Sequence, residues 1–291
     1  MEFKKNCGNT PLIKVADKLY AKLETYNPTG SVKDRMISYV VDKAIKDGVL
    51  NPGTTVCEAT SGNSGISLAA VSAAMGSRCV IFMPSNMSEE RKQMMRVYGA
   101  EVVEVPPSDF DGAIRARDEF LVANPGAWSP CQFSNADNVE CHREVTGPEI
   151  AMRLWLMNEQ WAAFVHGSGT GGTIEGIRQY TRCADGFMKN NEILPKICMV
   201  VPAESPHGIQ GIGDGRDFLA KQSDMDEVIV VSTEESIERA KRFARETGLL
   251  VGISSGANLV AAERWMSCNN PAGVVVTMLC DRGERYMSVY G

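Results

Sequence analysis

Short apolar runs rich in β-branched residues alternate with longer segments of helical period along the chain. Runs without regular polar positions are typical of strands that are buried on both faces of a sheet. We expect seven such strands, beginning at Val56, Cys79, Glu101, Ala162, Lys196, Glu227 and Gly273. The segments between them predict helices over 33–47, 64–74, 89–98, 110–124, 147–159, 173–180, 235–247 and 256–266.

This alternation predicts an α/β fold built from strand–helix–strand units with mainly parallel sheets. Seven strands are enough for one sheet, and two sheets with a cleft between them fit the spacing equally well. Glycines stand repeatedly where a predicted strand passes into a helix. Loops at such junctions are where α/β folds bind ligands.

Composition and charge narrow the functional classes. The formal net charge of −6 over 291 residues predicts no basic face for nucleic acid. The nine cysteines form no CxxC pair, and the N-terminal segment has no apolar run of the signal-peptide kind. No apolar stretch reaches the roughly 18 to 20 residues that span a bilayer. We therefore expect a cytoplasmic protein with reduced thiols.

A lysine stands at the start of the first long predicted helix. The segment NPTGSVKDR has the composition of a turn, and Ser31 is a candidate cap for a helix beginning at Val32 and Lys33. The positive end of a helix dipole disfavours a charged amine, which suits a nucleophilic lysine. Taken alone, the segment fits a solvated surface lysine as well.

Two further turns open helices with small polar residues. Residues 60–64 (TSGNS) offer hydroxyls, an amide and free backbone N–H groups, which is an arrangement suited to a carboxylate or phosphate. Ser254 and Ser255 open another predicted helix. An ordinary serine-capped turn explains either segment equally well.

The segment GSGTGGT, residues 167–173, is the densest in glycine. Glycines let backbone N–H groups close on a phosphate, and the threonines add hydroxyl donors. Residues 167–172 also match GxGxxG, which leaves a nicotinamide-dependent oxidoreductase as an alternative. No clear acidic residue follows at the expected distance, so a simple phosphate cup is favoured.

In this order the segments resemble the fold-type II pyridoxal-phosphate enzymes, and within them the cysteine synthases, or O-acetylserine sulfhydrylases. The ending CDRGERYMS is similar to the B-type isozymes. The matching segments span nearly the whole chain: GNTPL (8–12), AKLE (21–24), NPTGSVKDR (27–35), TSGNSGISLA (60–69), RVYGAEV (96–102), QFSN (132–135), TGPEI (146–150), GSGTGGT (167–173), GIQGIG (208–213), GISSGAN (252–258) and CDRGERYMS (280–288).

The resemblance implies a role for each matching position. Lys33 would hold pyridoxal 5′-phosphate as a Schiff base and then remove the α-proton of the substrate. Asn63 would contact the ring hydroxyl, and Ser254, with Ser255 as the fallback, would face the pyridine nitrogen. The cofactor phosphate would be bound by Gly169, Thr170, Gly171, Gly172 and Thr173. The substrate carboxylate would be bound by Thr60, Ser61, Gly62, Asn63, Ser64 and Gln132.

The resemblance also implies the reaction, which is β-substitution that makes L-cysteine from O-acetyl-L-serine and sulfide through an aminoacrylate. A serine beside the pyridine nitrogen makes the ring a weaker electron sink than a carboxylate would, which favours prompt loss of the β-substituent. Use of O-phosphoserine or thiosulfate, and cystathionine β-synthase-like activity, are the near alternatives. A dehydratase that acts on serine or threonine is a further one.

The implied fold has two three-layer αβα domains, like the β subunit of tryptophan synthase. The larger, cofactor-binding domain would comprise 11–34 and 136–291, and the smaller, mobile, substrate-binding domain 1–10 and 35–135. A homodimer is implied, and a complex with serine acetyltransferase is a further expectation. Neither a membrane nor a nucleic acid is expected as a binding partner.

The sequence departs from the family pattern at several places. SGNSG replaces the commoner SGNTG, and the segment after Gln132 lacks two usual prolines. Arg216 follows the GIQGIG motif, where its guanidinium is either an ordinary surface group or a site for an anionic leaving group or thiosulfate. No metal site is expected, because no Cys or His spacing completes one around Cys141 and His142. His166 and His207 are expected to be structural or to line the cleft.

Overall fold

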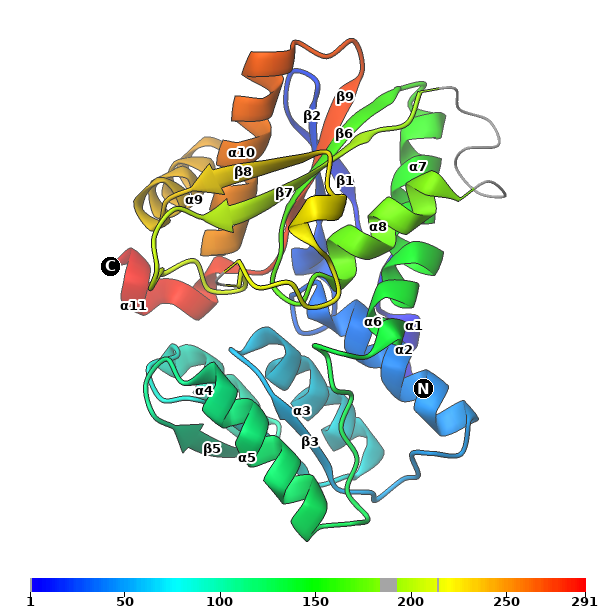
Figure 1. The fold of residues 1–291 in the computed structure, drawn as a ribbon, viewed down its shortest axis with the longest axis vertical. Helices are drawn as coiled ribbons and strands as arrows, with labels where there is room; N and C mark the ends of the chain where they lie inside the picture. The colour runs from blue at the N-terminus through cyan, green and yellow to red at the C-terminus, as the bar shows by residue number, and fades with distance from the viewer. Residues whose placement is uncertain (1, 184–192, 214) are drawn as a thin grey trace.

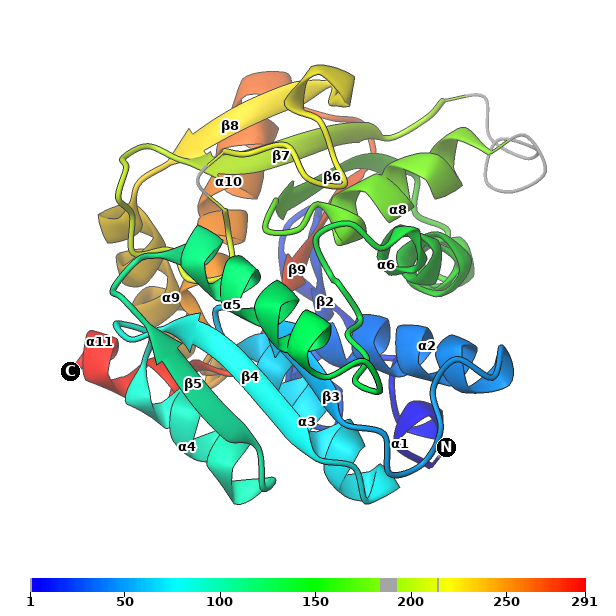
Figure 2. The same ribbon diagram turned by 60° about the horizontal axis from the view of Figure 1, so that its bottom comes forward.

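Two separate sheets form the framework of the protein. The computed structural model describes residues 2–183, 193–213 and 215–291. A six-stranded sheet has the order β1-β2-β9-β6-β7-β8, and a three-stranded sheet has the order β3-β4-β5 (Figures 1 and 2). Of the two arrangements that the strand spacing allowed, two sheets is therefore the observed one.

The strand bounds follow the apolar runs. The strands are β1 (Leu12–Ala16), β2 (Leu19–Leu23), β3 (Val56–Ala59), β4 (Cys79–Pro84), β5 (Glu101–Val105), β6 (Trp161–Gly167), β7 (Lys196–Pro202), β8 (Glu227–Val231) and β9 (Val274–Leu279). All seven predicted strands are confirmed. Every pairing is parallel except that of β1 with β2. This is an α/β fold with mainly parallel sheets.

The prediction missed β1 and β2 because Lys14 and Lys22 interrupt their apolar pattern. Every residue of β2 is nevertheless buried. This strand pairs in parallel with β9 over Leu19–Leu23, so the start of the chain completes the sheet that its end forms. No sequence-local signal reports a pairing between segments so far apart.

The eight predicted helices are confirmed with bounds within a turn of those expected, and three short helices among the described residues, at 2–5, 136–141 and 287–290, were not predicted. The helices are α1 (Glu2–Lys5), α2 (Lys33–Lys46), α3 (Asn63–Met75), α4 (Glu89–Val97), α5 (Phe110–Ala123), α6 (Ala136–Cys141), α7 (Gly147–Leu156), α8 (Gly172–Arg182), α9 (Thr233–Thr247), α10 (Ile253–Asn269) and α11 (Met287–Tyr290). A π-helical turn, His142–Thr146, joins α6 to α7, and 3₁₀ turns occupy Glu24–Tyr26, Gln222–Asp224 and Gly283–Tyr286. No helix in the described part of the chain is long and apolar enough to cross a bilayer.

Helices cover both faces of each sheet. Residues of α9 and α10 pack on one face of the large sheet, and residues of α7 and α8 pack on the other. The small sheet has α2, α3 and α4 on one face and α5 on the other. Each half is therefore a three-layer αβα unit with its own core.

Helix α2 begins where the two halves meet. The Val32 N–H donates to the Cys280 carbonyl (2.8 Å), directly after β9, while Met36 and Ile37 pack into the core of the small sheet. The first residue of the helix, Lys33, therefore lies at the carboxyl end of the large sheet, where α/β folds bind their ligands.

The expected cap at Ser31 is wrong. No side chain caps α2, and the Ser31 hydroxyl is buried without a hydrogen-bond partner among the described residues. Instead, Asp34 in the first turn accepts hydrogen bonds from the Thr29 N–H (2.7 Å) and hydroxyl (2.5 Å). The side chain of Asp34, within the helix, therefore holds this turn. The segment before Lys33 can then run beside the end of β9.

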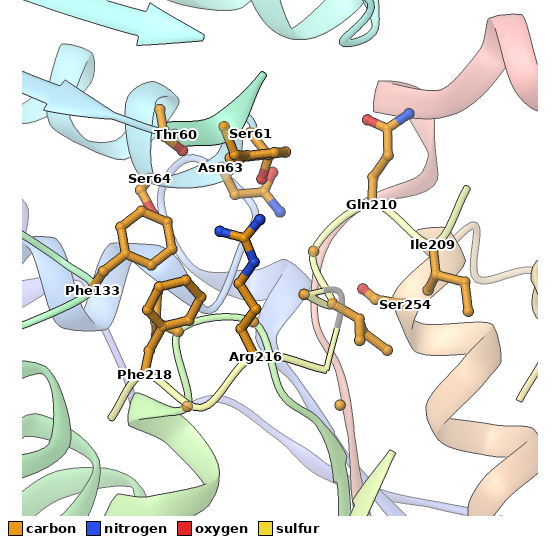
Figure 3. Close-up of a pocket in the computed structure, with 18 of the residues that line it drawn as sticks. Thr60, Ser61, Asn63, Ser64, Phe133, Ile209, Gln210, Arg216, Phe218 and Ser254 are labelled. Carbon is orange, nitrogen blue, oxygen red and sulfur yellow. The ribbon is translucent and has the colours of Figure 1, made fainter. Parts of the chain in front are cut away.

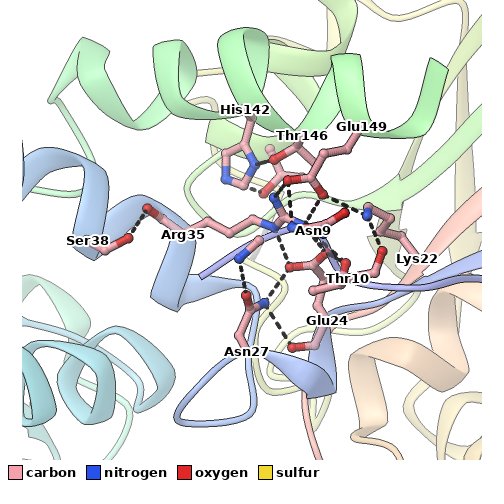
Figure 4. Close-up of polar contacts among 12 residues, drawn as sticks. Asn9, Thr10, Lys22, Glu24, Asn27, Arg35, Ser38, His142, Thr146 and Glu149 are labelled. Atoms are coloured by element: carbon pink, nitrogen blue, oxygen red, sulfur yellow. Dashed lines mark hydrogen bonds and ion pairs between the residues drawn. The ribbon is translucent and has the colours of Figure 1, made fainter. Parts of the chain in front are cut away.

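A buried group of charges fixes the start of α2 (Figure 4). Arg35 donates from Nε to Glu24 (2.6 Å) and from Nη2 to Glu149 (2.8 Å), and Lys22 pairs with Glu149 (2.8 Å). Burial alone would raise the pKa of Glu149, but the Arg35 and Lys22 cations outweigh it and lower that pKa to about 2. These contacts join α2 to β2 and to α7.

We expect Glu24→Gln to lower the free energy of unfolding by about 3 kcal/mol, because it leaves the buried Arg35 guanidinium partly unpaired. Chemical denaturation at pH 7 measures the change. The matched control is Asp17→Asn, which removes the exposed Lys14–Asp17 pair and should cost less than about 0.5 kcal/mol. Equal losses in the two variants would contradict the role assigned to the buried group.

Candidate active site

A cavity of about 330 Å³ lies between the two halves. This volume suits a small organic ligand. Its walls include nearly all of the predicted site residues: Lys33, Thr60, Ser61, Asn63, Ser64, Gln132, Gly169, Thr170, Gly171, Thr173 and Ser254. Gly62 and Gly172 are not among the lining residues. In Figure 3 the 60–64 turn faces Ser254 and Arg216 across the cavity.

The amine of Lys33 is poised as a nucleophile. Burial lowers the pKa of Lys33, while negative charge at Asp281 and Glu24 acts in the opposite direction. Among the described residues, no side chain or carbonyl is hydrogen-bonded to this amine. A partly buried lysine without a partner at the start of a helix has a larger neutral fraction than a surface lysine.

Residues 60–64 connect β3 to α3 and turn sharply. Gly62 has a φ of 149° and donates its N–H to the Thr60 hydroxyl (3.0 Å). A Cβ at Gly62 would collide with the side chain of Arg91, which explains the glycine. The Ser64 hydroxyl donates to Gln132 Oε1 (2.5 Å). With the first N–H groups of α3 lacking intrahelical acceptors, the turn is built to bind a carboxylate.

Asn63 has an acceptor to spare. Its Nδ2 donates to Asp281 Oδ2 (2.7 Å), and the Tyr286 hydroxyl donates to the same oxygen (2.6 Å). Within the described chain Asn63 Oδ1 is buried and has no partner. Because a buried acceptor without a donor is costly, this amide is suited to a ligand that brings a hydroxyl or N–H into the cavity.

The glycine-rich turn at the start of α8 is also suited to bind an anion. Gly171 has a φ of +86°, and a Cβ there would lie 2.5 Å from the Ala220 nitrogen. A Cβ at Gly169 would lie 2.5 Å from the Gly211 carbonyl. The bare backbone and the N–H groups of a helix start fit a phosphate without a cation. Gly172 faces away, against Asn138, so its glycine serves packing.

Burial favours the neutral form of two histidines near this turn, His142 and His166. Burial, followed by the nearby Arg35 cation, lowers the pKa of His142 well below its ordinary value, and burial lowers that of His166 to about 3. His142 bridges the hydroxyls of Thr173 (3.2 Å) and Thr146 (2.9 Å). His166 and His207 line the cavity, as expected. No cluster of three or more metal-binding side chains occurs among the described residues.

The structure separates Ser254 from its neighbour. Ser254 lines the cavity, whereas the Ser255 hydroxyl accepts a hydrogen bond from the Cys280 N–H (2.9 Å) and is fully buried. Ser255 is therefore committed to holding α10 against the end of β9. Only Ser254 is placed to meet a ligand, so the fallback assignment to Ser255 is not needed.

Several residues around the cavity were missed by the sequence reasoning. Arg91 has a side chain that is 1% exposed; it donates to Gln210 Oε1 and to the Tyr286 hydroxyl, and it stacks on the Tyr286 ring (4.5 Å). Glu58 is fully buried in β3, inside an otherwise apolar run. A charged residue in a strand buried on both faces was the available signal for Glu58. For Arg91, on an amphipathic helix, there was none.

Arg216 lies at the mouth of the cavity. Its guanidinium donates to Asp111 Oδ1 on α5 (2.8 Å), and its side chain is half exposed. Figure 3 shows it extending toward the 60–64 turn, past Phe133 and Phe218, whose rings pack at 4.9 Å. The ion pair joins the two halves across the opening. Arg216 is therefore a cavity residue and not an ordinary surface arginine.

Known proteins resemble this chain along almost its whole length. A family model described as "pyridoxal-phosphate dependent enzyme" matches residues 4–281. A probable cysteine synthase of Bacillus subtilis is 38% identical, over 97% of this chain and 94% of that protein. A hydrogen sulfide-producing enzyme, solved as a mutant with an α-aminoacrylate intermediate, superimposes with a TM-score of 0.91 at 35% identity, over 99% and 90% of the two chains. An O-acetylserine-dependent cystathionine β-synthase of Helicobacter pylori gives a TM-score of 0.89 at 32% identity, over 98% and 96%.

Proposed function

The chain belongs to the pyridoxal-phosphate-dependent enzymes, and from this premise we propose that it makes L-cysteine from O-acetyl-L-serine and sulfide. Pyridoxal 5′-phosphate is its cofactor. The observation that supports the reaction best is the placement of the partly buried Lys33 amine, which has no hydrogen-bond partner among the described residues, between a carboxylate turn and a phosphate cup. A substrate that is bound through its carboxylate and also bound to the cofactor would present its α- and β-carbons to the Lys33 amine.

The residues of the cavity fit the cofactor. Lys33 Nζ would form the covalent link, and the cup at Gly169–Thr173 would hold the phosphate. Asn63, with its spare acceptor, would meet the ring hydroxyl, and Ser254 would face the ring nitrogen. When bound, the cofactor supplies an acceptor for the electron pair left at the α-carbon.

In the proposed reaction Lys33 acts twice, after the amino group of the substrate has displaced its Nζ from the covalent link. Its Nζ takes the proton from the α-carbon, and acetate leaves from the β-carbon with the C–O electron pair. Sulfide then forms the C–S bond at the β-carbon, and Lys33 returns a proton to the α-carbon. The turn at 60–64 and Gln132 hold the carboxylate still through these steps, which is where positioning contributes to the rate.

Ser254 would decide how the electron pair is used. A hydroxyl stabilises a protonated ring nitrogen less than a carboxylate does, so the pair would move promptly to expel the β-substituent. The family membership and the cup geometry both favour this chemistry over the nicotinamide-dependent alternative suggested by GxGxxG at 167–172.

The halves of the protein support the proposed domain division. All strands of the large sheet lie within 11–34 and 136–291, and the small sheet lies within 35–105. We propose that the smaller unit, 1–10 with 35–135, closes over the substrate when its turn captures the carboxylate. Closure would exclude water from the reacting carbons.

For its surroundings we propose the cytoplasm, because all nine cysteines are free and five of them are buried, as suits a reducing compartment. A complex with serine acetyltransferase, the enzyme class that makes O-acetylserine, is part of the same proposal.

We expect Lys33→Ala to lose the covalent cofactor and to lower cysteine formation on the order of a thousandfold or more, since it removes both the link and the base. Borohydride reduction, digestion and mass spectrometry locate the cofactor in the wild type on the peptide that contains Lys33. The control is Lys46→Ala, an exposed lysine on the same helix. Cofactor retained covalently in Lys33→Ala would refute the assignment.

A second candidate substrate is O-phosphoserine, and the Arg216 guanidinium at the cavity mouth is the observation that favours it. Thiosulfate would use the same group. We expect Arg216→Ala to lower kcat/KM for O-phosphoserine about tenfold or more, the equivalent of a charged hydrogen bond, and to change the value for O-acetyl-L-serine little. Equal changes for both substrates would exclude a phosphate contact. Asp111→Asn, which releases the guanidinium, should act in the opposite direction.

We propose a homodimer that buries the exposed apolar side chains at the end of α7, namely Met152, Trp155, Leu156 and Met157. Such a contiguous group on a water-soluble surface marks an interface. In analytical ultracentrifugation the wild type should have twice the mass of one chain, and Trp155→Glu should shift toward the monomer. Val122→Glu, at an exposed valine on α5, should remain dimeric. A dimeric Trp155→Glu would place the interface elsewhere.

A further inference from the structure

Glu58 is a buried carboxylate directly behind the carboxylate turn. It lies in β3, is 0% exposed, and accepts hydrogen bonds from the N–H groups of Ala59 (2.8 Å) and Gln132 (3.0 Å). Arg117 of α5 donates to it from Nη1 (3.0 Å). The reaction proposed above does not use this group.

Gln132 is the residue that Glu58 holds. The Gln132 side chain donates to the Ala59 carbonyl (2.9 Å) and accepts from the Ser64 hydroxyl (2.5 Å). The backbone carbonyl of Gln132 accepts a hydrogen bond from Asn138 Nδ2 (2.9 Å), which also donates to the Thr170 hydroxyl (3.0 Å). Gln132 thus stands between the carboxylate turn and the phosphate cup, and its N–H is anchored by Glu58.

The backbone around Gln132 needs this anchor. Cys131 has a φ of +49°, an unfavourable conformation for a residue with a side chain. Without Glu58 the buried N–H of Gln132 would lack an acceptor. A buried carboxylate is a costly acceptor for this N–H, because apolar residues of similar size often stabilise a core better than a buried charged group does. A role in the site is a reason to keep it.

We propose that the ionised Glu58 carboxylate is a positioning group, which holds Gln132 against the Thr60–Ser64 turn and thereby sets the affinity for the carboxylate of the amino-acid substrate. Glu58 itself touches no substrate. This inference rests on the proposed function and deepens it, since it names what orders the substrate site.

The ionisation of Glu58 makes the proposal testable by pH. Burial raises the pKa of Glu58 to about 7, although the Gln132 N–H and Arg117 act to lower it. The other titratable groups nearby are Asp118, bound to Arg117, and the thiols of Cys57 and Cys131. Burial raises the pKa of Cys57 to about 12, so that thiol stays neutral.

Stability and affinity should respond oppositely to acid. Because the pKa of Glu58 is higher in the folded than in the unfolded chain, its protonation favours the folded state as the pH falls from about 7 to about 4.5. The protonated carboxyl, however, offers fewer acceptors to Gln132 and Arg117. If Glu58 positions Gln132, its protonation should therefore weaken substrate binding. A purely structural role for Glu58 predicts no loss of substrate affinity in acid.

The test compares the wild-type holoenzyme with Glu58→Gln and with Glu104→Gln, a control on the same small sheet whose carboxylate pairs with Lys92 away from Gln132. Calorimetry with L-alanine, which has no leaving group, gives Kd, and turnover of O-acetyl-L-serine gives KM and kcat. At pH 8 we expect Glu58→Gln to raise Kd and KM about tenfold with kcat within about twofold. Glu104→Gln should match the wild type.

The ratio of the Kd of Glu58→Gln to that of the wild type should fall toward one below about pH 6, because the wild-type carboxyl is then protonated as well. Taking this ratio cancels the titration of the alanine amine. If Glu58→Gln does not fold, the double variant Glu58→Gln with Arg117→Met removes the unpaired guanidinium and carries the same expectation.

Unchanged Kd and KM in Glu58→Gln, or a Kd ratio that stays constant with pH, would overturn the proposal. A fall in kcat at constant KM would do so too, because it would place Glu58 in the chemical steps. A wild type that binds L-alanine but does not turn over O-acetyl-L-serine would refute the proposed function alone. The L-alanine titrations decide the role of Glu58 in either case.

Discussion

The enclosure of the Arg35 guanidinium by Glu24 and Glu149 is the contact on which the active site depends. It fixes the start of α2 to β2 on one side and to α7 on the other, two residues after Lys33. Moving any of these three elements would move the amine. Buried charges of this kind lose hydration, and they are stable only because each finds its partners at hydrogen-bond distance.

The cavity itself uses little formal charge. Its two anion sites are helix starts with glycines and hydroxyls, and the cations stand behind them or at the rim: Arg91 beneath Gly62, Arg117 behind Glu58, and Arg216 at the mouth. Backbone N–H groups are already oriented before a ligand arrives, so binding requires little reorganisation.

The site exists only where the two halves meet. The carboxylate turn, Gln132 and α5 come from the part of the chain around the small sheet, whereas the phosphate cup, Ser254 and Cys280 belong to the large sheet. Arg91, Asn63 and Asn138 carry hydrogen bonds from one part to the other, to Gln210, Asp281 and Gln132 respectively. A change of angle between the halves would therefore alter the cavity directly, because its walls belong to both.

The sequence by itself determined the seven predicted strands, most helices and the local chemistry of each turn, because apolar period, glycine and hydroxyl residues act over a few neighbouring positions. Its motif order also predicted that Lys33, the 60–64 turn and the glycine-rich turn belong to one site, and all three line the cavity. Only the tertiary structure decided that there are two sheets, that β2 completes the large one, that Ser254 and not Ser255 faces the cavity, and that Arg216 reaches it. The contacts of Glu58 with Gln132 and of Arg91 with Gln210 also appear only in the tertiary structure. These features depend on contacts between segments far apart in the chain, and no pattern of neighbouring residues encodes such contacts.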